Sequence, residues 1–131
     1  MTAATGISDV GLPFDKFVNT IREDNKPIIS PAKFARAFHI QLQDVATEAH
    51  VHRNTLRRHP DSPQTQRFLR DTLKVLSAVS EVQDDVSEGM YWIRNHPIPA
   101  FAHKTAWELI GEGRTNDLIA YLDSISDGFV G

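Results

Sequence analysis

The pattern of apolar and polar positions along the chain predicts an all-α protein. In two N-terminal segments, apolar residues recur at helical spacing, and each segment begins at a proline, Pro13 or Pro31. The apolar positions of these two helices are Phe14, Phe17, Val18, Ile21, Phe34, Ala35 and Phe38. Ser30 directly precedes Pro31, and we expect its hydroxyl to cap the second helix. We expect the aromatic side chains to pack beneath the segment that follows.

That segment combines two short helical patterns with a turn between them. In the first pattern Val45, Ala46 and Ala49 form a small apolar face, and in the second Leu56 is the apolar anchor. His50 falls in the turn, where glycine is usual, so it must tolerate or avoid a left-handed backbone. The order of these features predicts a helix-turn-helix. The alternative is an ordinary helical hairpin with a solvated basic face.

The outward side of this predicted helix-turn-helix carries side chains that suit DNA. The first residues of the second helix are those that usually enter the major groove. Arg53 can pair with guanine and Asn54 with adenine, whereas Arg57 and Arg58 are better placed for phosphates. The candidate DNA-binding residues are Gln41, Gln43, His52, Arg53, Asn54, Thr55, Arg57 and Arg58. The segment therefore predicts binding to double-stranded DNA.

Beyond a proline-rich turn at residues 59–63, the pattern predicts one long helix and then shorter ones. The long helix is expected from about Gln64 to Val86 and joins the two halves of the chain. Its apolar stripe consists of Phe68, Leu69, Leu73, Leu76, Val79, Val82 and Val86. Later apolar positions are Met90, Tyr91, Trp92, Ile93, Leu109, Ile110, Leu118, Ile119, Tyr121, Leu122 and Ile125. Thr105 and Glu108 fit a capping box, and Gly128 stands where the last helix should be capped.

Length and composition suit one compact domain or two small helical units that share a core. The chain has 131 residues, of which 40% are hydrophobic and 24% charged. We divide it into a flexible arm (1–13), a helix-turn-helix domain (14–77) and a C-terminal domain (78–131). No apolar run approaches the roughly 20 residues that span a bilayer, and the first residues do not form a signal peptide. Because there are also no cysteines, we expect a cytoplasmic protein without a membrane partner.

The formal net charge of −3 conceals a division between the two halves. Residues 26–70 hold eight basic and three acidic side chains, whereas residues 71–131 hold four basic and ten acidic ones. The basic segment contains the predicted helix-turn-helix, which is the sign of charge that DNA binding requires. The two halves therefore indicate two partners of opposite character.

Motifs for catalysis or metal binding are weak or absent from the sequence. His50 and His52 form a bare His-x-His, and no Asp or Glu stands at metal-site spacing to support it. Neither a glycine-rich phosphate loop nor a nucleophile elbow occurs. We therefore expect a protein that is not an enzyme and needs neither metal nor cofactor. The histidines are expected to serve in turns, in packing or in phosphate contacts.

A set of residues in this order carries a family resemblance over roughly residues 14–131. The residues are Ala46, His50, Val51, Leu56, Trp92, Ile93, Asn95, His96, Pro97, Phe101, Thr105, Glu108, Leu109, Ile110, Leu118, Leu122, Ile125 and Gly128. The chain resembles the Xre/MbcA/ParS family of antitoxins, which join an Xre-like helix-turn-helix to a C-terminal toxin-binding domain. His103 and Ala106 depart from the family pattern, which often has glycine and proline there. Both departures lie where the helix after Thr105 begins.

The resemblance implies an antitoxin that neutralises a RES-domain toxin, a class that consumes NAD, and that binds operator DNA to repress its own operon. A cleft for an anionic dinucleotide presents basic groups, which the acidic C-terminal half would complement. The candidate toxin-binding residues are Trp92, Trp107, Glu108, Glu112, Asp117, Tyr121, Asp123, Asp127, Phe129, Val130 and Gly131. We expect the last three to form a short tail, directed outward by a cap at Gly128, that approaches the active site of the toxin.

Two further expectations concern alternatives and assembly. A stand-alone helix-turn-helix transcriptional regulator, whose C-terminal half dimerises or senses a ligand, is the alternative function. A homodimer, or a larger complex with toxin, is expected because one helix-turn-helix covers only half of a two-fold DNA site. The candidate dimer surface is the apolar face of the first helix, which alternatively is buried within its own chain.

Overall fold

The computed structural model describes residues 14–24, 26–80 and 85–130 of the chain. These residues form helices and contain no β-strand, only isolated bridges between Arg22 and Ile29 and between Ile98 and Lys104. The predicted all-α fold class is therefore confirmed. Two compact units divide the chain, Met1–Leu69 and Arg70–Gly131. The division falls within one helix, α5, whereas the predicted domain boundary lay further along, between residues 77 and 78.

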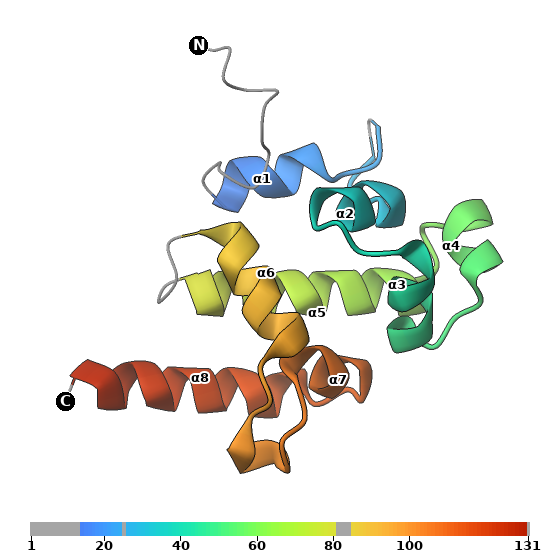
Figure 1. Cartoon of the computed structure of the whole chain (residues 1–131). Coiled ribbons are helices and arrows are strands. Elements are labelled where there is room, and N and C mark those ends of the chain that lie inside the picture. The colour runs from blue at the N-terminus through green and yellow to red at the C-terminus, as the bar shows by residue number, and fades with distance from the viewer. Residues whose placement is uncertain (1–13, 25, 81–84, 131) are drawn as a thin grey trace. The chain divides into compact units, whose positions relative to one another are not determined.

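The first unit consists of short helices joined by tight turns (Figure 1). They are α1 (Phe14–Thr20), α2 (Pro31–Ala37), α3 (Leu42–Ala49) and α4 (Arg53–Arg58), followed by the start of α5 (Pro63–Ser80). Helices α2, α3 and α4 pack on one another. The buried hydrophobic residues of this unit are Phe17, Ile21, Ile29, Phe34, Ala35, Ile40, Val45, Ala46, Ala49, Leu56, Phe68 and Leu69.

Aromatic rings form the centre of contact between α1 and the end of α2. The Phe38 ring meets the rings of Phe17 and Phe34 edge to face, at centroid distances of 5.2 Å and 5.1 Å. The Ser30 hydroxyl accepts a hydrogen bond from the Lys33 N–H at 3.1 Å, so the predicted cap of α2 is confirmed. Because Phe17 is 0% exposed, the α1 face proposed as a dimer surface is largely covered within the chain itself.

A buried glutamine at the start of α5 ties two loops of the first unit together. The Gln66 side chain, in a residue only 2% exposed, accepts a hydrogen bond from the Ile29 N–H at 3.0 Å and donates one to the Ile29 carbonyl at 2.8 Å. It also donates to the Pro60 carbonyl at 2.7 Å. The loop before α2 and the turn after α4 are therefore both fixed to α5. The sequence pattern gave no sign of this role.

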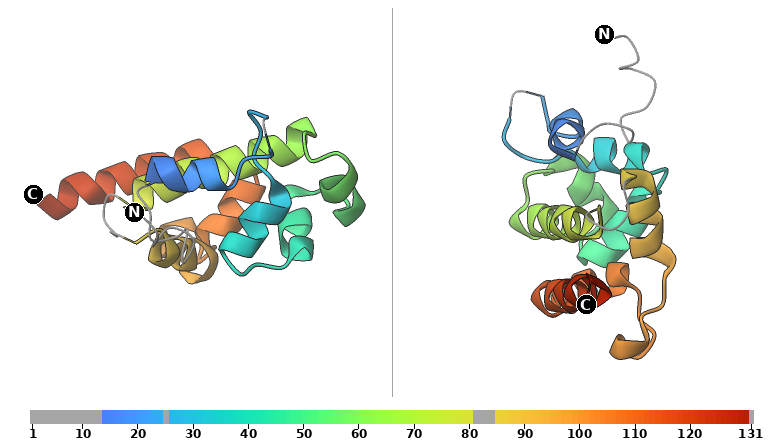
Figure 2. Two further views of the ribbon diagram at one scale, coloured as in Figure 1. Left: turned by 90° about the horizontal axis from the view of Figure 1, so that it is seen from above. Right: turned by 90° about the vertical axis from the view of Figure 1, so that its left-hand side faces the viewer.

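The second unit contains the rest of α5 and the elements that follow it. These are α6 (Val86–Asn95), the 3-10 helix η2 (Pro99–Phe101), α7 (Ala106–Gly111) and α8 (Thr115–Val130). Helix α8 lies beside α5 and runs in the same direction, as the views in Figures 1 and 2 agree. The Thr115 hydroxyl joins them by donating to the Asp71 carboxylate at 3.1 Å. The buried hydrophobic residues are Leu73, Val75, Leu76, Val79, Val86, Met90, Ile93, Ile98, Ala106, Trp107, Leu109, Ile110 and Leu118.

The prediction that the long helix runs to Val86 was wrong. Helix α5 ends at Ser80, and Val86 is the first residue of α6. Asp85 supplies the physical reason for the new start, because its carboxylate accepts the Ser87 N–H at 2.8 Å and caps α6. Five of the other six predicted stripe residues are buried as expected, and Val82 lies outside the described residues.

The predicted left-handed cap at Gly128 was also wrong. Helix α8 continues through Gly128 to Val130, because glycine favours a helix end but a helix tolerates it at a cost of about 1 kcal/mol. Phe129 and Val130 therefore belong to the helix and do not form an outward tail. Gly131 lies outside the described residues.

The capping box before α7 is present as predicted, but a strained turn leads into it. The Thr105 hydroxyl accepts the Glu108 N–H at 3.2 Å, and the Glu108 carboxylate accepts the Thr105 N–H at 2.9 Å. Ala102 and His103, with φ of 57° and 66°, are both left-handed. The His103 N–H donates to the Ile98 carbonyl at 2.9 Å, which closes this turn. His103 therefore occupies a left-handed position, which the glycine of the family pattern would adopt with the least strain.

Candidate functional site

The turn between α3 and α4 ends the first helix in a well-defined way. His50 is left-handed, with φ of 59° and ψ of 41°. The His50 N–H donates to the Thr47 carbonyl at 3.2 Å, and the Val51 N–H donates to the Ala46 carbonyl at 3.0 Å. This pair of bonds is the Schellman pattern that usually has glycine at its left-handed position. The sequence identified His50 as the residue on which the turn depends, and the structure resolves its conformation as left-handed.

A side chain from α5 holds the end of α3 in place. The Gln64 amide donates to the carbonyls of Ala49 and His50 at 3.0 Å and 3.1 Å. These are the carbonyls of the last residue of α3 and of its C-cap, at the end of a helix where carbonyls need partners from outside the regular helical pattern. The α3–α4 turn is therefore supported from outside as well as by its own hydrogen bonds.

Helix α4 is short, and one buried residue fixes its orientation. Leu56 is 3% exposed, which turns the opposite face of α4 to solvent. At its start the Nδ1 atom of His52 accepts the Asn54 N–H at 3.1 Å, so this ring caps the helix. His52 was predicted as a DNA contact, and its Nδ1 atom is engaged with the backbone.

The candidate DNA-binding side chains of α4 are gathered on its open face. Arg53, Asn54, Arg57 and Arg58 are exposed, and Thr55 is half-buried. Within the described ranges of the chain, none of these three arginines forms an ion pair. Their charges are therefore available to an anionic partner.

Some other polar and basic side chains of the first unit already have partners. Gln41 and Gln43 are exposed at the start of α3, and the Gln43 amide donates to the Thr47 hydroxyl at 3.1 Å. Lys33 donates to the Asp24 carboxylate at 2.7 Å. This hydrogen bond, together with the positive charge of Lys33, lowers the pKa of Asp24. Lys33 is therefore already paired with the Asp24 carboxylate.

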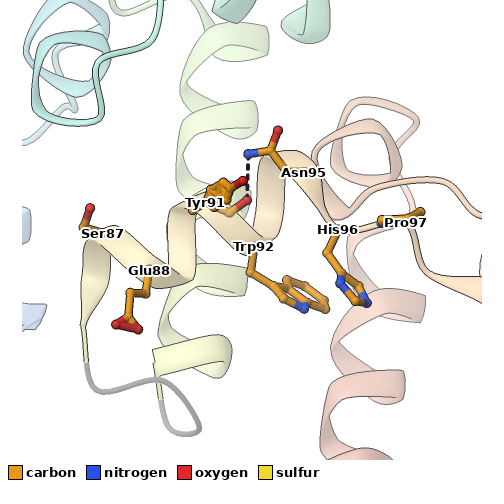
Figure 3. A pocket seen from close by; sticks show the side chains of 7 residues that line it. All are labelled: Ser87, Glu88, Tyr91, Trp92, Asn95, His96 and Pro97. Atoms are coloured by element: carbon orange, nitrogen blue, oxygen red, sulfur yellow. Dashed lines mark hydrogen bonds between the residues drawn. The ribbon is translucent and has the colours of Figure 1, made fainter.

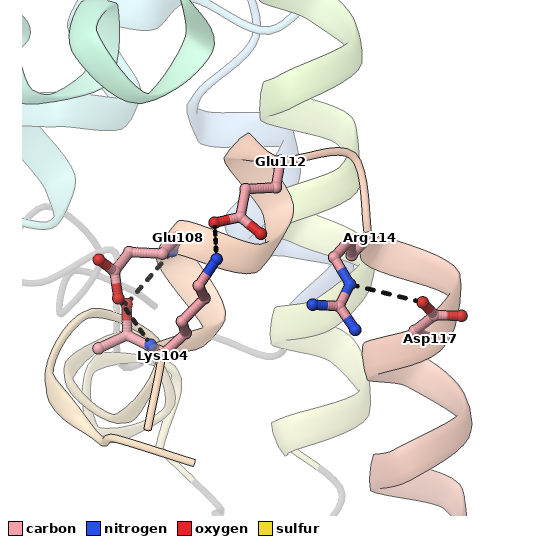
Figure 4. A network of polar contacts seen from close by, with 6 residues as sticks. Lys104, Glu108, Glu112, Arg114 and Asp117 are labelled. Atoms are coloured by element: carbon pink, nitrogen blue, oxygen red, sulfur yellow. Dashed lines mark hydrogen bonds and ion pairs between the residues drawn. The ribbon is translucent and has the colours of Figure 1, made fainter. Parts of the chain in front are cut away.

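In the second unit, several of the predicted acidic toxin contacts already have partners (Figure 4). Lys104 pairs with Glu112 at 2.6 Å, and Arg114 pairs with Asp117 at 3.6 Å. Glu108 serves the capping box before α7. Asp123 is exposed, and Asp127 lies on α8. The structure therefore leaves less free negative charge on this side than the sequence suggested.

The aromatic candidates of this unit differ in their exposure. Trp107 is only 6% exposed, and the Arg94 guanidinium lies 5.2 Å from the centroid of its ring. It belongs to the core and offers little surface to a partner. Trp92 is half-buried and stacks on His96, with centroids 5.1 Å apart and an interplanar angle of 15°. Tyr121 is half-buried and packs edge to face against Phe101 at 5.5 Å.

Two adjoining cavities open beside the Trp92–His96 stack. The larger, of about 640 Å³, is lined by Ser87, Glu88, Tyr91, Trp92, Asn95, His96 and Pro97 (Figure 3). The smaller, of about 180 Å³, is lined by Ala78, Val79, Trp92, His96, Tyr121, Leu122 and Ile125. We refer to both together as the Trp92–His96 groove. Sequence reasoning included Trp92 and Tyr121 but missed the rest, although the i, i+4 spacing of Trp92 and His96 was visible.

Neither metal binding nor a membrane span is indicated where the structure describes the chain. In these ranges no three His, Asp or Glu side chains come together in a way that could hold a metal ion. No described helix combines the length and the apolar character needed to cross a membrane. No protein-family model, no curated protein and no solved structure matches the chain.

Proposed function

We propose that this chain is an antitoxin that binds operator DNA through its first unit and neutralises a RES-domain toxin through its second. The observation that carries the DNA-binding half is the open face of α4, where Arg53, Arg57 and Arg58 are exposed and unpaired among the described residues. The order of sequence features resembling the Xre/MbcA/ParS antitoxins supports the toxin-binding half.

The size and support of α4 suit insertion into a DNA groove. An α-helix with its side chains is about 10–12 Å in diameter, which fits a major groove about 12 Å wide, and the six residues of α4 are about 9 Å long. Arg53 and Asn54 lie at its first turn, where base edges would be met, and Arg57 and Arg58 lie in its last turn, beside the phosphates. The buried Leu56 and the supported turn hold this helix rigidly, so little ordering would be needed on binding.

A base-reading role for Arg53 can be tested by substitution. A preferred duplex is first selected from a random pool with the wild-type chain. We expect Arg53→Ala to lose about 1–3 kcal/mol on that duplex and much less on unrelated DNA, because a bidentate contact to guanine is lost. Fluorescence anisotropy with both duplexes measures the two losses. An equal loss on both would assign Arg53 to the phosphates instead.

The toxin-binding half is tested by the NAD content of cells. The reading frames beside the gene of this chain are searched for a RES-domain toxin, which is then expressed with and without the chain, and NAD is measured in extracts. We expect the chain to preserve NAD and to co-purify with the toxin as a defined complex. Depletion of NAD despite equal expression of both proteins would reject the antitoxin function.

The small cavity gives specific support to a second candidate, a stand-alone regulator that senses a ligand. A space of about 180 Å³ with an aromatic wall is smaller than most ligand sites, but it could admit a small apolar molecule. DNA binding that responds to a small molecule, in a chain that leaves NAD unprotected, would favour this candidate over the antitoxin.

A further inference from the structure

The Trp92–His96 groove combines aromatic, apolar and acidic side chains of the second unit. Its two cavities share two lining residues, Trp92 and His96. Among the described residues, the large hydrophobic side chains that are exposed are Tyr91 at 64% and Ile125 at 37%. Tyr91 lines the larger cavity and Ile125 the smaller. Exposed large side chains beside a hollow are typical of a surface that binds another protein.

The charge around the groove is negative. Glu88 lines the larger cavity, is exposed and has no ion pair within the described part of the chain. Asp85 is also exposed and lies two helical turns before Trp92 on the same side of α6. Its carboxylate caps α6, but no cation is paired with it within the described part of the chain. Neither cavity is lined by Lys or Arg. An anionic rim beside an apolar hollow favours a partner with an apolar anchor flanked by cations.

The cations of this unit do not neutralise the rim. Lys104 and Arg114 hold other carboxylates, and Arg94 lies over a buried tryptophan ring. Lys74 is exposed on α5, one helical turn before the α5 residues that line the smaller cavity, and Arg70 is exposed one turn earlier still. Neither of them lines either cavity. Among the described residues no cation is paired with Glu88 or Asp85, so their negative charge can attract a partner from outside.

We propose that the Trp92–His96 groove is the docking site for a basic, amphipathic segment of a partner protein. An apolar side chain of that segment enters the smaller cavity against Trp92, and neighbouring Lys or Arg side chains lie against Glu88 and Asp85. This inference rests on the proposed function, in which the partner is the toxin. It places docking away from the paired carboxylates of Glu112 and Asp117. Self-association of two copies through this groove fits less well, since both copies carry the same negative charge there.

A pair of synthetic peptides tests the chemistry of the site. One is an amphipathic helix of about 20 residues with a Leu and Phe stripe and a Lys-rich opposite face, and the other has Glu in place of every Lys. Titrated into the ¹⁵N-labelled full chain, the basic peptide should shift the indole N–H of Trp92 and leave that of Trp107 in place. At low salt it should bind at least about tenfold more tightly than the acidic peptide, and added salt should narrow this difference. Equal binding of both peptides, or shifts confined to other surfaces, would overturn the proposal.

Substitutions at the groove provide matched variants. Ile125→Glu should weaken the basic peptide at least about tenfold, because it places a charge at the apolar cavity. Ala120→Glu adds the same charge on another, exposed face of α8 and should leave affinity unchanged. Glu88→Lys should reverse the preference between the two peptides at low salt. Equal effects of Ile125→Glu and Ala120→Glu, with unfolding curves that show both folded, would contradict the assignment.

The same variants separate this inference from the function on which it rests. In the NAD assay, a wild-type chain that fails to protect NAD rejects the proposed function, whatever the peptides show. If wild type and Ile125→Glu protect NAD equally, the antitoxin function stands and the docking site is overturned. Sedimentation of the full chain completes the test. A dimer that Ile125→Glu dissociates, in a chain that binds neither peptide, would assign the groove to self-association and overturn the proposal.

Discussion

Residues other than glycine adopt the left-handed backbone conformation at several turns in both units. Among the described residues they are His39, His50, Ala102 and His103, with φ between 55° and 66°. Histidine is among the residues that adopt this conformation more readily than most, whereas alanine pays its full steric cost because its Cβ lies too close to the backbone. Ala102 is therefore the position where backbone strain can be measured with the least change in side-chain chemistry.

We expect Ala102→Gly to raise the free energy of unfolding by about 1 kcal/mol. The substitution removes one methyl group from an exposed residue at φ of 57° and leaves every backbone hydrogen bond of the turn in place. Ala100→Gly is the matched control, since Ala100 is exposed two residues earlier in η2 and does not have a positive φ. At position 100, glycine should lower the free energy of unfolding. Urea unfolding of the three proteins measures both changes, and a loss of stability in Ala102→Gly would show that the turn carries no such strain.

At the scale of single residues, sequence reasoning succeeded where a side chain acts on its own neighbours. The Ser30 cap, the Thr105–Glu108 capping box and the burial of Leu56 follow from spacing of three or four residues. Gln66 could not be foreseen, because its hydrogen bonds reach Ile29 across 37 positions of sequence. In the sequence alone, a buried glutamine within a helical pattern cannot be distinguished from an ordinary exposed polar residue.

Among helices, the role of Gln66 gives a direct test of how the loops of the first unit are held. Its side chain bonds to both the N–H and the carbonyl of Ile29. We expect Gln66→Leu to lower the free energy of unfolding by about 3 kcal/mol, because these buried backbone groups would lose their partner. Arg67→Leu, at the exposed next position, should change stability by less than about 0.5 kcal/mol. If chemical denaturation shows similar small changes for both, water replaces the glutamine at little cost.

The crossing of α6 over α5 depends on a residue without a side chain. A Cβ atom at Gly89 would lie 3.0 Å from the Leu76 Cδ1 atom and 3.5 Å from the Val79 Cγ1 atom, and Leu76 is fully buried. We expect Gly89→Val to lower the free energy of unfolding by about 1–3 kcal/mol through overpacking. Ser87→Val, exposed on the same helix, controls for the intrinsic preference of valine and should cost less than about 1 kcal/mol. Thermal unfolding compares them, and equal losses would mean that the crossing relaxes freely.

Helices were predicted best where the apolar period was long and their ends least well. The stripe of α5 was correct in its buried positions, but its end was not, because Val82 and Val86 continue the same period across residues 81–84. The start of α6 is decided by the Asp85 cap, which one sequence position cannot distinguish from an ordinary exposed acid. The Trp92–His96 groove could not be predicted either, because its smaller cavity forms only when α5, α6 and α8 pack together, and no local sequence pattern specifies that packing.

For the whole molecule, charge is divided more clearly than the net value of −3 indicates. The open arginines belong to the first unit, and in the second unit part of the negative charge is taken up by Lys104 and Arg114. An overall acidic chain is thus compatible with the proposed binding to DNA, because the Debye length of about 8 Å at physiological salt confines each charge to its own surroundings. Burial of Phe17 also directs the search for a dimer surface away from α1.

The salt dependence of DNA binding would reveal both the phosphate contacts and the number of chains on the duplex. If Arg57 and Arg58 each meet one phosphate, a two-fold dimer makes four such contacts, and the logarithm of its affinity should fall against the logarithm of salt with a slope of about −3.6. Arg58→Ala should reduce that slope by about 1.8 for a dimer and by about 0.9 for a single chain, with the same loss on preferred and unrelated DNA. Asp61→Ala, an exposed substitution in the turn after α4, tests whether any nearby change of charge has this effect, and it should leave the slope unchanged. Anisotropy titrations over a range of salt concentrations measure all three proteins. A slope that Arg58→Ala leaves untouched would remove this arginine from the phosphate contacts, even if the affinity fell.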